Sequence, residues 1–141
     1  MVSSYVLDSS SLFTLFFLDS EEKVHNILKE SSVLDLSGYE IGSILTKGND
    51  GHIKGLERDI IRDLTKEIQK VIANIRVIRL NTLDIAEIMK LSLSTGLTFY
   101  DASYIFYSKS HQMPLLTDDK EMYREAIKVG LEVKKVEEVF N

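Results

Sequence analysis

Four acidic residues that lie far apart in the chain occupy positions where carboxylates can act together: Asp8, Glu40, Asp101 and Asp119. Asp8 and Asp119 come just after short apolar runs. Glu40 and Asp101 lie near the beginnings of predicted helices. Several carboxylates brought close together cannot all ionise cheaply unless a cation joins them. Ligand sets made only of oxygen favour Mg²⁺ or Mn²⁺, with waters and substrate phosphates in the remaining positions. The four acids therefore indicate a divalent-metal site that can turn water into a nucleophile against a phosphodiester.

A simpler interpretation of the same acids is that they only stabilise helix ends. A negative charge in the first turn of a helix interacts favourably with the helix dipole. On spacing alone, this capping interpretation is favoured for Glu40 and Asp101. Ser10 and Thr117 each stand two residues from an acid, and their hydroxyl groups could orient the carboxylates from behind.

The elements that must position these residues alternate along the chain between strands and helices. Apolar, β-rich runs predict strands at 2–7, 33–36, 76–80, 114–117 and 131–134. Helical periodicity and capping residues predict helices at 12–18, 21–31, 38–47, 53–73, 83–95, 101–111 and 121–128. Strands and helices in this order predict an α/β fold of three layers, with a central parallel sheet covered by helices on both faces. Ligands of such sheets bind beyond the carboxyl ends of the strands, where Asp8 and Asp119 are expected.

Local details of the predicted elements bear on two of the acids. Ser37 is expected to cap the helix 38–47, which places Glu40 in the first turn of that helix. The segment 48–51, GNDG, predicts a turn before the long helix 53–73. Asp101 is expected in the first turn of the helix 101–111.

Length and composition restrict the class of protein. A chain of 141 residues without a visible linker or repeat predicts one domain over residues 1–141. No apolar run approaches the roughly 20 residues that cross a membrane, and the first residues lack the features of a signal peptide. The absence of Cys excludes a disulfide framework and thiolate metal sites, so we expect a cytoplasmic location. A net charge of -5 argues against binding nucleic acid by bulk charge alone, but not against a nuclease whose metal ions neutralise an acidic pocket.

Other enzymes that use acidic residues in phosphoryl chemistry match the sequence poorly. A haloacid-dehalogenase-like phosphatase requires D-x-D after its first strand, and the third position here is Ser10. A receiver domain requires an early acidic pair and an acceptor Asp on a middle strand, whereas the pair Asp118 and Asp119 comes late in the chain. No G-x-G-x-x-G or Walker A pattern is present to bind a nucleotide.

Three segments, VLDSSSL, YEIGSIL and FYDASYIFYSKSHQMPLLTDDKEM, resemble PIN domains of the VapC toxin type in their order and spacing. The resemblance extends from Tyr5 to about Val133, and its most specific part is Y-D-A-x-Y followed by P-L-L-T-x-D. Carried over residue by residue, it implies that the catalytic Mg²⁺ or Mn²⁺ is bound by Asp8, Glu40, Asp101 and Asp119. Ser10 and Thr117 match hydroxyl residues next to the first and last acids. Asp118 leaves the register of the last acid open, and Asp119 is preferred because it keeps the T-x-D spacing.

The resemblance implies a metal-dependent endoribonuclease that is the toxin of a toxin–antitoxin pair. Its implied partners are an RNA substrate, a protein antitoxin and a second copy of the chain in a homodimer. Ser43 stands where many relatives carry Asn, which would alter hydrogen bonding behind the metal without removing a ligand. One alternative is a non-catalytic PIN-like module that binds RNA or protein, which predicts that one of the four acids is missing. A housekeeping RNA-processing nuclease would share all these residues.

Overall fold

A five-stranded parallel sheet forms the centre of the computed structural model, which describes residues 4–18, 20–49 and 56–140. The strands are β1 (Val6–Leu7), β2 (Ser32–Leu34), β3 (Arg76–Ile78), β4 (Leu115–Leu116) and β5 (Val133–Lys134). They lie in the order β3-β2-β1-β4-β5, and each neighbouring pair is parallel. The predicted parallel sheet is therefore confirmed.

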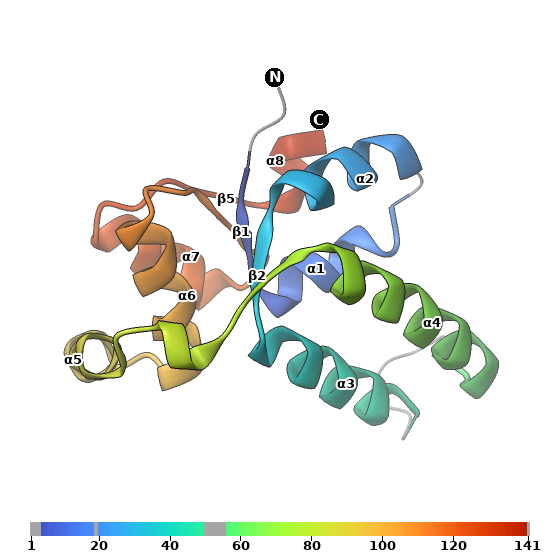
Figure 1. Ribbon diagram of the computed structural model, residues 1–141, viewed down its shortest axis with the longest axis horizontal. Coiled ribbons are helices and arrows are strands. Elements are labelled where there is room, and N and C mark those ends of the chain that lie inside the picture. Colours follow the sequence, from blue (N-terminus) through green and yellow to red (C-terminus); the bar gives the residue numbers. More distant parts are fainter. Residues whose placement is uncertain (1–3, 19, 50–55, 141) are drawn as a thin grey trace.

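Helices cover both faces of this sheet (Figure 1). One face carries α1 (Ser9–Leu15), α2 (Glu21–Glu30), α3 (Leu36–Asn49), α4 (Arg58–Asn74) and the short α8 (Val136–Phe140). The other carries α5 (Ile85–Thr95), α6 (Phe99–Ser110) and α7 (Lys120–Lys128), and a 3₁₀ turn, Leu80–Thr82, precedes α5. The three-layer α/β/α fold predicted from the alternation of elements is thus the observed one.

Two apolar cores lie on opposite sides of the sheet because side chains alternate along each strand. On the central strand, Leu7 packs into the core beneath α1–α4, whereas its neighbour Val6 packs against α6 and α7. Leu116 and Leu115 divide between the same two cores on β4. Strands buried on both faces read as continuous apolar runs, and this is why such short segments were recognisable in the sequence.

The path of the chain creates a switch point between β1 and β4. From β1 the chain proceeds to β2 and β3 on one side and then returns to place β4 on the other side of β1. Adjacent connections therefore diverge at the carboxyl ends of β1 and β4, the place where ligands of open α/β sheets generally bind. Asp8 follows β1 directly, and Thr117 follows β4 directly.

Three predicted boundaries were wrong near Glu40. The strand expected at 33–36 ends at Leu34, because Leu36 already begins α3. Glu40 is therefore the fifth residue of α3 and lies outside its first turn. Ser37 is inside the helix and does not cap it. Of the turn expected at 48–51, residues 48 and 49 complete α3, and residues 50 and 51 lie outside the described part of the chain.

Other helix limits also differ from the sequence-based expectation. The first helix begins at Ser9 rather than at residue 12, because the side chain of Asp8 caps it. The long helix expected at 53–73 begins at Arg58 in the described residues, and 53–55 are outside them. The helix α6 begins at Phe99, two residues earlier than expected, because Thr98 caps it. The terminal helix α8 was not predicted, since five residues carry too little periodicity.

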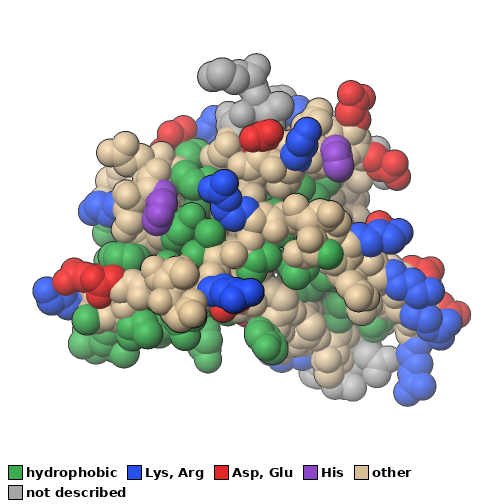
Figure 2. Space-filling model, in the orientation of Figure 1, with side chains coloured by type: hydrophobic (Ala, Val, Ile, Leu, Met, Phe, Trp, Pro, Cys, Tyr) green, Lys and Arg blue, Asp and Glu red, His purple; other side chains and the backbone are tan. Residues whose placement is uncertain are grey.

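The surface of α5 is unusually apolar. Three large side chains spaced by four residues, Ile85, Met89 and Leu93, are 50%, 44% and 78% exposed. Figure 2 shows apolar side chains gathered in the lower left of the view, where α5 lies in Figure 1. In the described residues, no helix is both long enough and apolar enough to cross a membrane.

Candidate acidic active site

Asp8 is the most enclosed of the four predicted site acids, with a side chain that is 2% exposed. Its Oδ1 accepts hydrogen bonds from the backbone N–H of Ser11, at 2.9 Å, and from Ser10 Oγ, at 2.8 Å. Its Oδ2 accepts a hydrogen bond from Thr117 Oγ1. The bond to Ser11 caps α1, so the fold itself fixes the Asp8 carboxylate at the end of β1.

Two hydroxyl groups join the ends of β1 and β4 behind Asp8. Ser10 Oγ accepts a hydrogen bond from the backbone N–H of Asp118, at 3.0 Å, while it donates to Asp8. Thr117 Oγ1 accepts from the backbone N–H of Asp119, also at 3.0 Å, while it donates to the other oxygen of Asp8. The two hydroxyls predicted to orient the acids therefore hold the loop after β4 against the carboxylate that follows β1.

The adjacent acids Asp118 and Asp119 turn toward different elements. Asp119 Oδ1 accepts a hydrogen bond of 2.8 Å from the backbone N–H of Met122 and caps α7. Asp118 Oδ1 accepts one of 3.0 Å from the backbone N–H of Val136, at the beginning of α8. Burial is the main cause of the raised pKa of Asp101, and the negative charge of Asp119 adds to it.

Glu40 and Asp101 approach this edge from helices of opposite layers. Glu40, half-buried in the second turn of α3, accepts a hydrogen bond of 2.8 Å from the phenol of Tyr104. Asp101 is in the first turn of α6, where its backbone N–H donates to the capping Thr98. The capping interpretation therefore fails for Glu40, because that residue is beyond the first turn, but remains compatible with Asp101.

Electrostatics shows that these carboxylates act on one another. Burial, together with the negative charges of Asp119, Glu40 and Asp8, raises the pKa of Asp101 to about 6. Burial also raises the pKa of Asp8, against the opposing effect of the hydrogen bond from Thr117. The pKa of Glu40 is raised by burial too, while the hydrogen bond from Tyr104 opposes the shift.

No positive side chain compensates this charge in the described part of the chain. The ion pairs found there are all within single helices: Arg62–Asp59, Lys70–Glu67, Lys90–Glu87 and Lys128–Glu125. A group of anions without a protein counter-charge has the donor chemistry of a site for a hard divalent cation.

The observed spacing of the acids is looser than direct chelation requires. Among residues 4–18, 20–49 and 56–140, no three Asp, Glu or His side chains converge closely enough to enclose an ion directly. Uncompensated carboxylates repel one another, and Glu40 and Asp119 are each held by a hydrogen bond. Since Mg²⁺ commonly keeps several waters and needs only one or two carboxylates, the donor set fits such an ion without further protein ligands.

Sequence reasoning missed the role of two residues at this edge. Ser37 was expected to cap α3, yet its Oγ lies 2.6 Å from the hydroxyl of Tyr104. Tyr104 has no place among the site residues predicted from the sequence, yet its hydroxyl donates to Glu40. The available signal was spacing, since Tyr104 lies three residues after Asp101 and Ser37 three residues before Glu40, as neighbours on one helix face.

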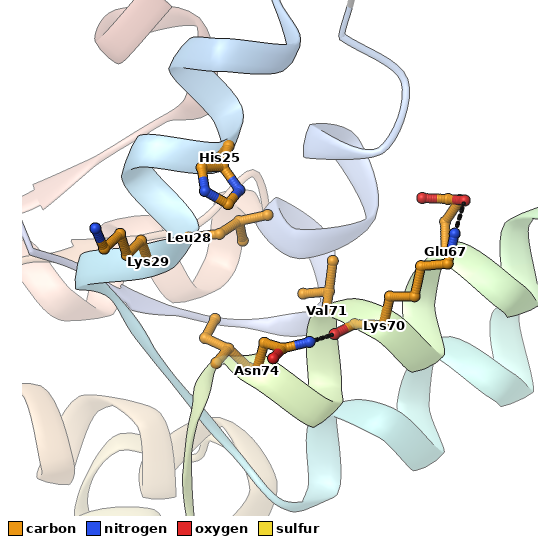
Figure 3. A pocket seen from close by; sticks show the side chains of 8 residues that line it. His25, Leu28, Lys29, Glu67, Lys70, Val71 and Asn74 are labelled. Atoms are coloured by element: carbon orange, nitrogen blue, oxygen red, sulfur yellow. Dashed lines mark hydrogen bonds and ion pairs between the residues drawn. The ribbon is translucent and has the colours of Figure 1, made fainter.

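Two hollows of the surface lie between α2 and α4. Figure 3 shows a groove between α2 and α4, lined on one side by His25 and Leu28 and on the other by Lys70 and Val71. A second hollow continues it toward Leu18. None of the four acids lines either of these hollows, so the acidic edge is identified here by its carboxylates.

The raised pKa of Asp101 predicts how the stability of the metal-free protein depends on pH. The folded chain holds the Asp101 proton up to about pH 6, whereas an unfolded chain releases it near its ordinary value of 3.8. The associated stabilisation is present below about pH 4 and is lost as the pH rises through 6. Asp101→Asn should therefore raise the free energy of unfolding at pH 7 by on the order of 1 kcal/mol, after allowance for solvent screening, and by less at pH 4.5.

Urea denaturation in EDTA at the two pH values measures this difference. Asp63→Asn, at an exposed position on α4, is the matched control and should leave the pH dependence as in the unmodified chain. A gain in stability for Asp101→Asn that is equal at both pH values would contradict the electrostatic origin.

Comparison with known proteins shows which family the chain resembles. The family model of the PIN domain matches residues 5–128. A protein of Pyrobaculum aerophilum named "Exonuclease VapC9" is 30% identical over 122 residues, which are 86% of this chain and 85% of the relative. The crystal structure of PAE2754 from the same organism superposes with a TM-score of 0.77 at 24% identity, covering 98% of this chain and 86% of that one. The match over most of its length, on the same α/β fold, shows that the chain belongs to the PIN domain family.

Proposed function

We propose that this protein is a divalent-metal-dependent ribonuclease that hydrolyses the phosphodiester bonds of RNA. The observation that carries the proposal is the set of mutually repelling carboxylates at the switch point of the sheet, with no compensating positive side chain in the described residues. Membership of the PIN domain family and the nuclease name of the relative from Pyrobaculum aerophilum support it.

The four acids are proposed to hold the ion and to prepare the attacking water. Asp8, Asp101 and Asp119 bind the ion, and Glu40 either binds it or positions the attacking water. Bound Mg²⁺ or Mn²⁺ would neutralise the site, make water nucleophilic and stabilise charge on the departing oxygen. In hydrolysis, the oxygen of water bonds to phosphorus while the ester P–O bond breaks, and the oxygen that leaves gains a proton.

Ser10 and Thr117 are proposed to keep Asp8 in place during this reaction. Their hydroxyl groups donate to the two different oxygens of the Asp8 carboxylate. A carboxylate held in this way presents a fixed donor to an incoming ion, which reduces the ordering needed on binding.

Cleavage of RNA by the purified protein tests this function. We expect cleavage with Mg²⁺ or Mn²⁺, none in EDTA, and losses of about 100-fold or more in Asp8→Asn and Asp101→Asn, because a neutral amide is a weaker ligand for a hard cation. The sharpest comparison is between adjacent residues: Asp119→Asn should lose activity, whereas Asp118→Asn should keep it. The side-chain amide oxygen introduced by Asp118→Asn would still accept the hydrogen bond from Val136, so the attachment of α8 is preserved.

Cleavage at the unmodified rate by Asp8→Asn would contradict the site assignment. Cleavage that persists in EDTA would contradict metal dependence. If Asp118→Asn loses cleavage and Asp119→Asn keeps it, Asp118 and not Asp119 is the last acid of the site. A circular RNA substrate distinguishes endonuclease from exonuclease cleavage. We propose an endoribonuclease, which cleaves a circular RNA. The relative is named an exonuclease, and an exonuclease cannot cleave a circle because it requires a chain end.

We further propose that the chain acts in the cytoplasm as the toxin of a toxin–antitoxin pair and forms a homodimer. The VapC name of the relative supports the toxin role, although a housekeeping nuclease would carry the same acids. The exposed apolar residues Ile85, Met89 and Leu93 of α5 support association, since large exposed apolar patches are typical of surfaces that another chain covers.

Light scattering tests both partnerships in one experiment. The chain alone should have twice its mass of 16.1 kDa. Coexpression with the product of the adjacent reading frame should give a heavier complex that no longer cleaves RNA. A monomer would refute the homodimer, and a neighbouring product that neither binds nor inhibits would refute the pairing and favour the housekeeping role.

A further inference from the structure

The hydroxyl of Tyr104 connects the two layers of the fold at the acidic edge. The ring belongs to the core beneath α6 and α7 and is 0% exposed. Its hydroxyl lies 2.8 Å from Glu40 Oε1 and 2.6 Å from Ser37 Oγ, and both partners belong to α3. The helix α3 packs through Ile41 and Leu45 into the opposite core. A side chain anchored in one layer thus holds an acid that comes from the other.

The donor count gives this contact a direction. A phenol has one hydrogen to donate, and an ionised carboxylate can only accept. Tyr104 therefore donates to Glu40 and accepts from Ser37, whose hydroxyl is also buried. Hydrogen bonds that run in one direction polarise one another, and a bond to a charged acceptor is stronger than a neutral one.

Satisfaction of a buried phenol does not by itself explain this arrangement. Ser37 alone would give the Tyr104 hydroxyl a partner, as buried polar groups require. The bond to Glu40 restricts a side chain that would otherwise lose much rotamer freedom on binding any ligand. Tyr104 also lies three residues after Asp101 on α6. One face of this helix therefore carries Asp101 and also contacts Glu40.

We propose that Tyr104, supported by Ser37, is a positioning residue that holds Glu40 in place for the acidic cluster. This inference rests on the proposed metal-dependent function and adds a residue that acts through Glu40 without contacting the reacting atoms. Removal of a group that orients a metal-site carboxylate commonly costs 10–100-fold in metal affinity or activity.

Tyr104→Phe removes only the hydroxyl, and Tyr107→Phe is the matched control. Tyr107 is a second buried tyrosine of α6 and is 5% exposed, but its recorded interactions are a ring stack on His111 and a backbone bond rather than a contact with an acid. Calorimetric titration with Mn²⁺ and the kcat and KM for RNA cleavage are measured for each variant. We expect Tyr104→Phe to lower Mn²⁺ affinity or kcat by about 10-fold with little change in KM, and Tyr107→Phe to leave both unchanged.

A double-mutant cycle decides whether the effect passes through Glu40. In the background of Glu40→Gln, Tyr104→Phe should cause little further loss, because the residue that it positions has already been altered. Ser37→Ala, which leaves the ring and its packing in place, should give a smaller loss in the same direction. Equal effects of Tyr104→Phe and Tyr107→Phe, or full additivity with Glu40→Gln, would overturn the proposal.

The Mn²⁺ titration also separates this inference from the proposed function. An unmodified protein that neither binds Mn²⁺ nor cleaves RNA would refute the metal-dependent nuclease itself. If the unmodified protein binds Mn²⁺ and the Tyr104→Phe variant binds and cleaves equally well, only the role of Tyr104 is refuted.

Discussion

Carboxylates that repel one another lie at one edge of the sheet, and the fold has to hold them there against this repulsion. Parallel pairing of β1 with β2 and β4 brings the residues after those strands to the same edge. Asp8, Glu40, Asp101 and Asp119 arrive there from different elements, and burial with mutual repulsion raises the pKa of Asp101 to about 6. The two apolar cores on either side of the sheet hold this arrangement against its own charge. An arrangement that costs stability and has no internal counter-charge in the described residues is typical of a functional site.

The residues that shape the site also complete the fold, so the two roles cannot be assigned to separate groups. Asp8 caps α1 and Asp119 caps α7, each through a bond to the third backbone N–H that follows. Thr117 continues β4 and at the same time fixes the Asp8 carboxylate. For this reason the changes that test function replace Asp by Asn, which is itself a good capping residue. A substitution by Ala would remove charge and cap together.

Much of this arrangement followed from the sequence because the relevant signals are local. Apolar runs buried on both faces identified the strands, and an acid or hydroxyl after each run located the edge. The errors near Glu40 have a local cause: Leu36 and Ser37 also suit a strand end or a cap, whereas in the structure Leu36 begins α3 and packs, partly buried, against the core. The contact between Tyr104 and Glu40 joins residues that are 64 positions apart, and no local pattern specifies such a pairing. The sequence likewise does not specify which backbone N–H each of the adjacent acids Asp118 and Asp119 binds, because their partners, Val136 and Met122, are found only in three dimensions.

We propose that a divalent cation binds between these acids. Anomalous diffraction from crystals soaked in Mn²⁺ would test it most directly, because it locates the ion without reference to activity. We expect a peak at the carboxyl ends of β1 and β4, about 2.0–2.3 Å from oxygens of at least one or two of the four acids, with waters in the other positions. Bound Mn²⁺ found only at other surfaces, such as the groove between α2 and α4, would contradict the account.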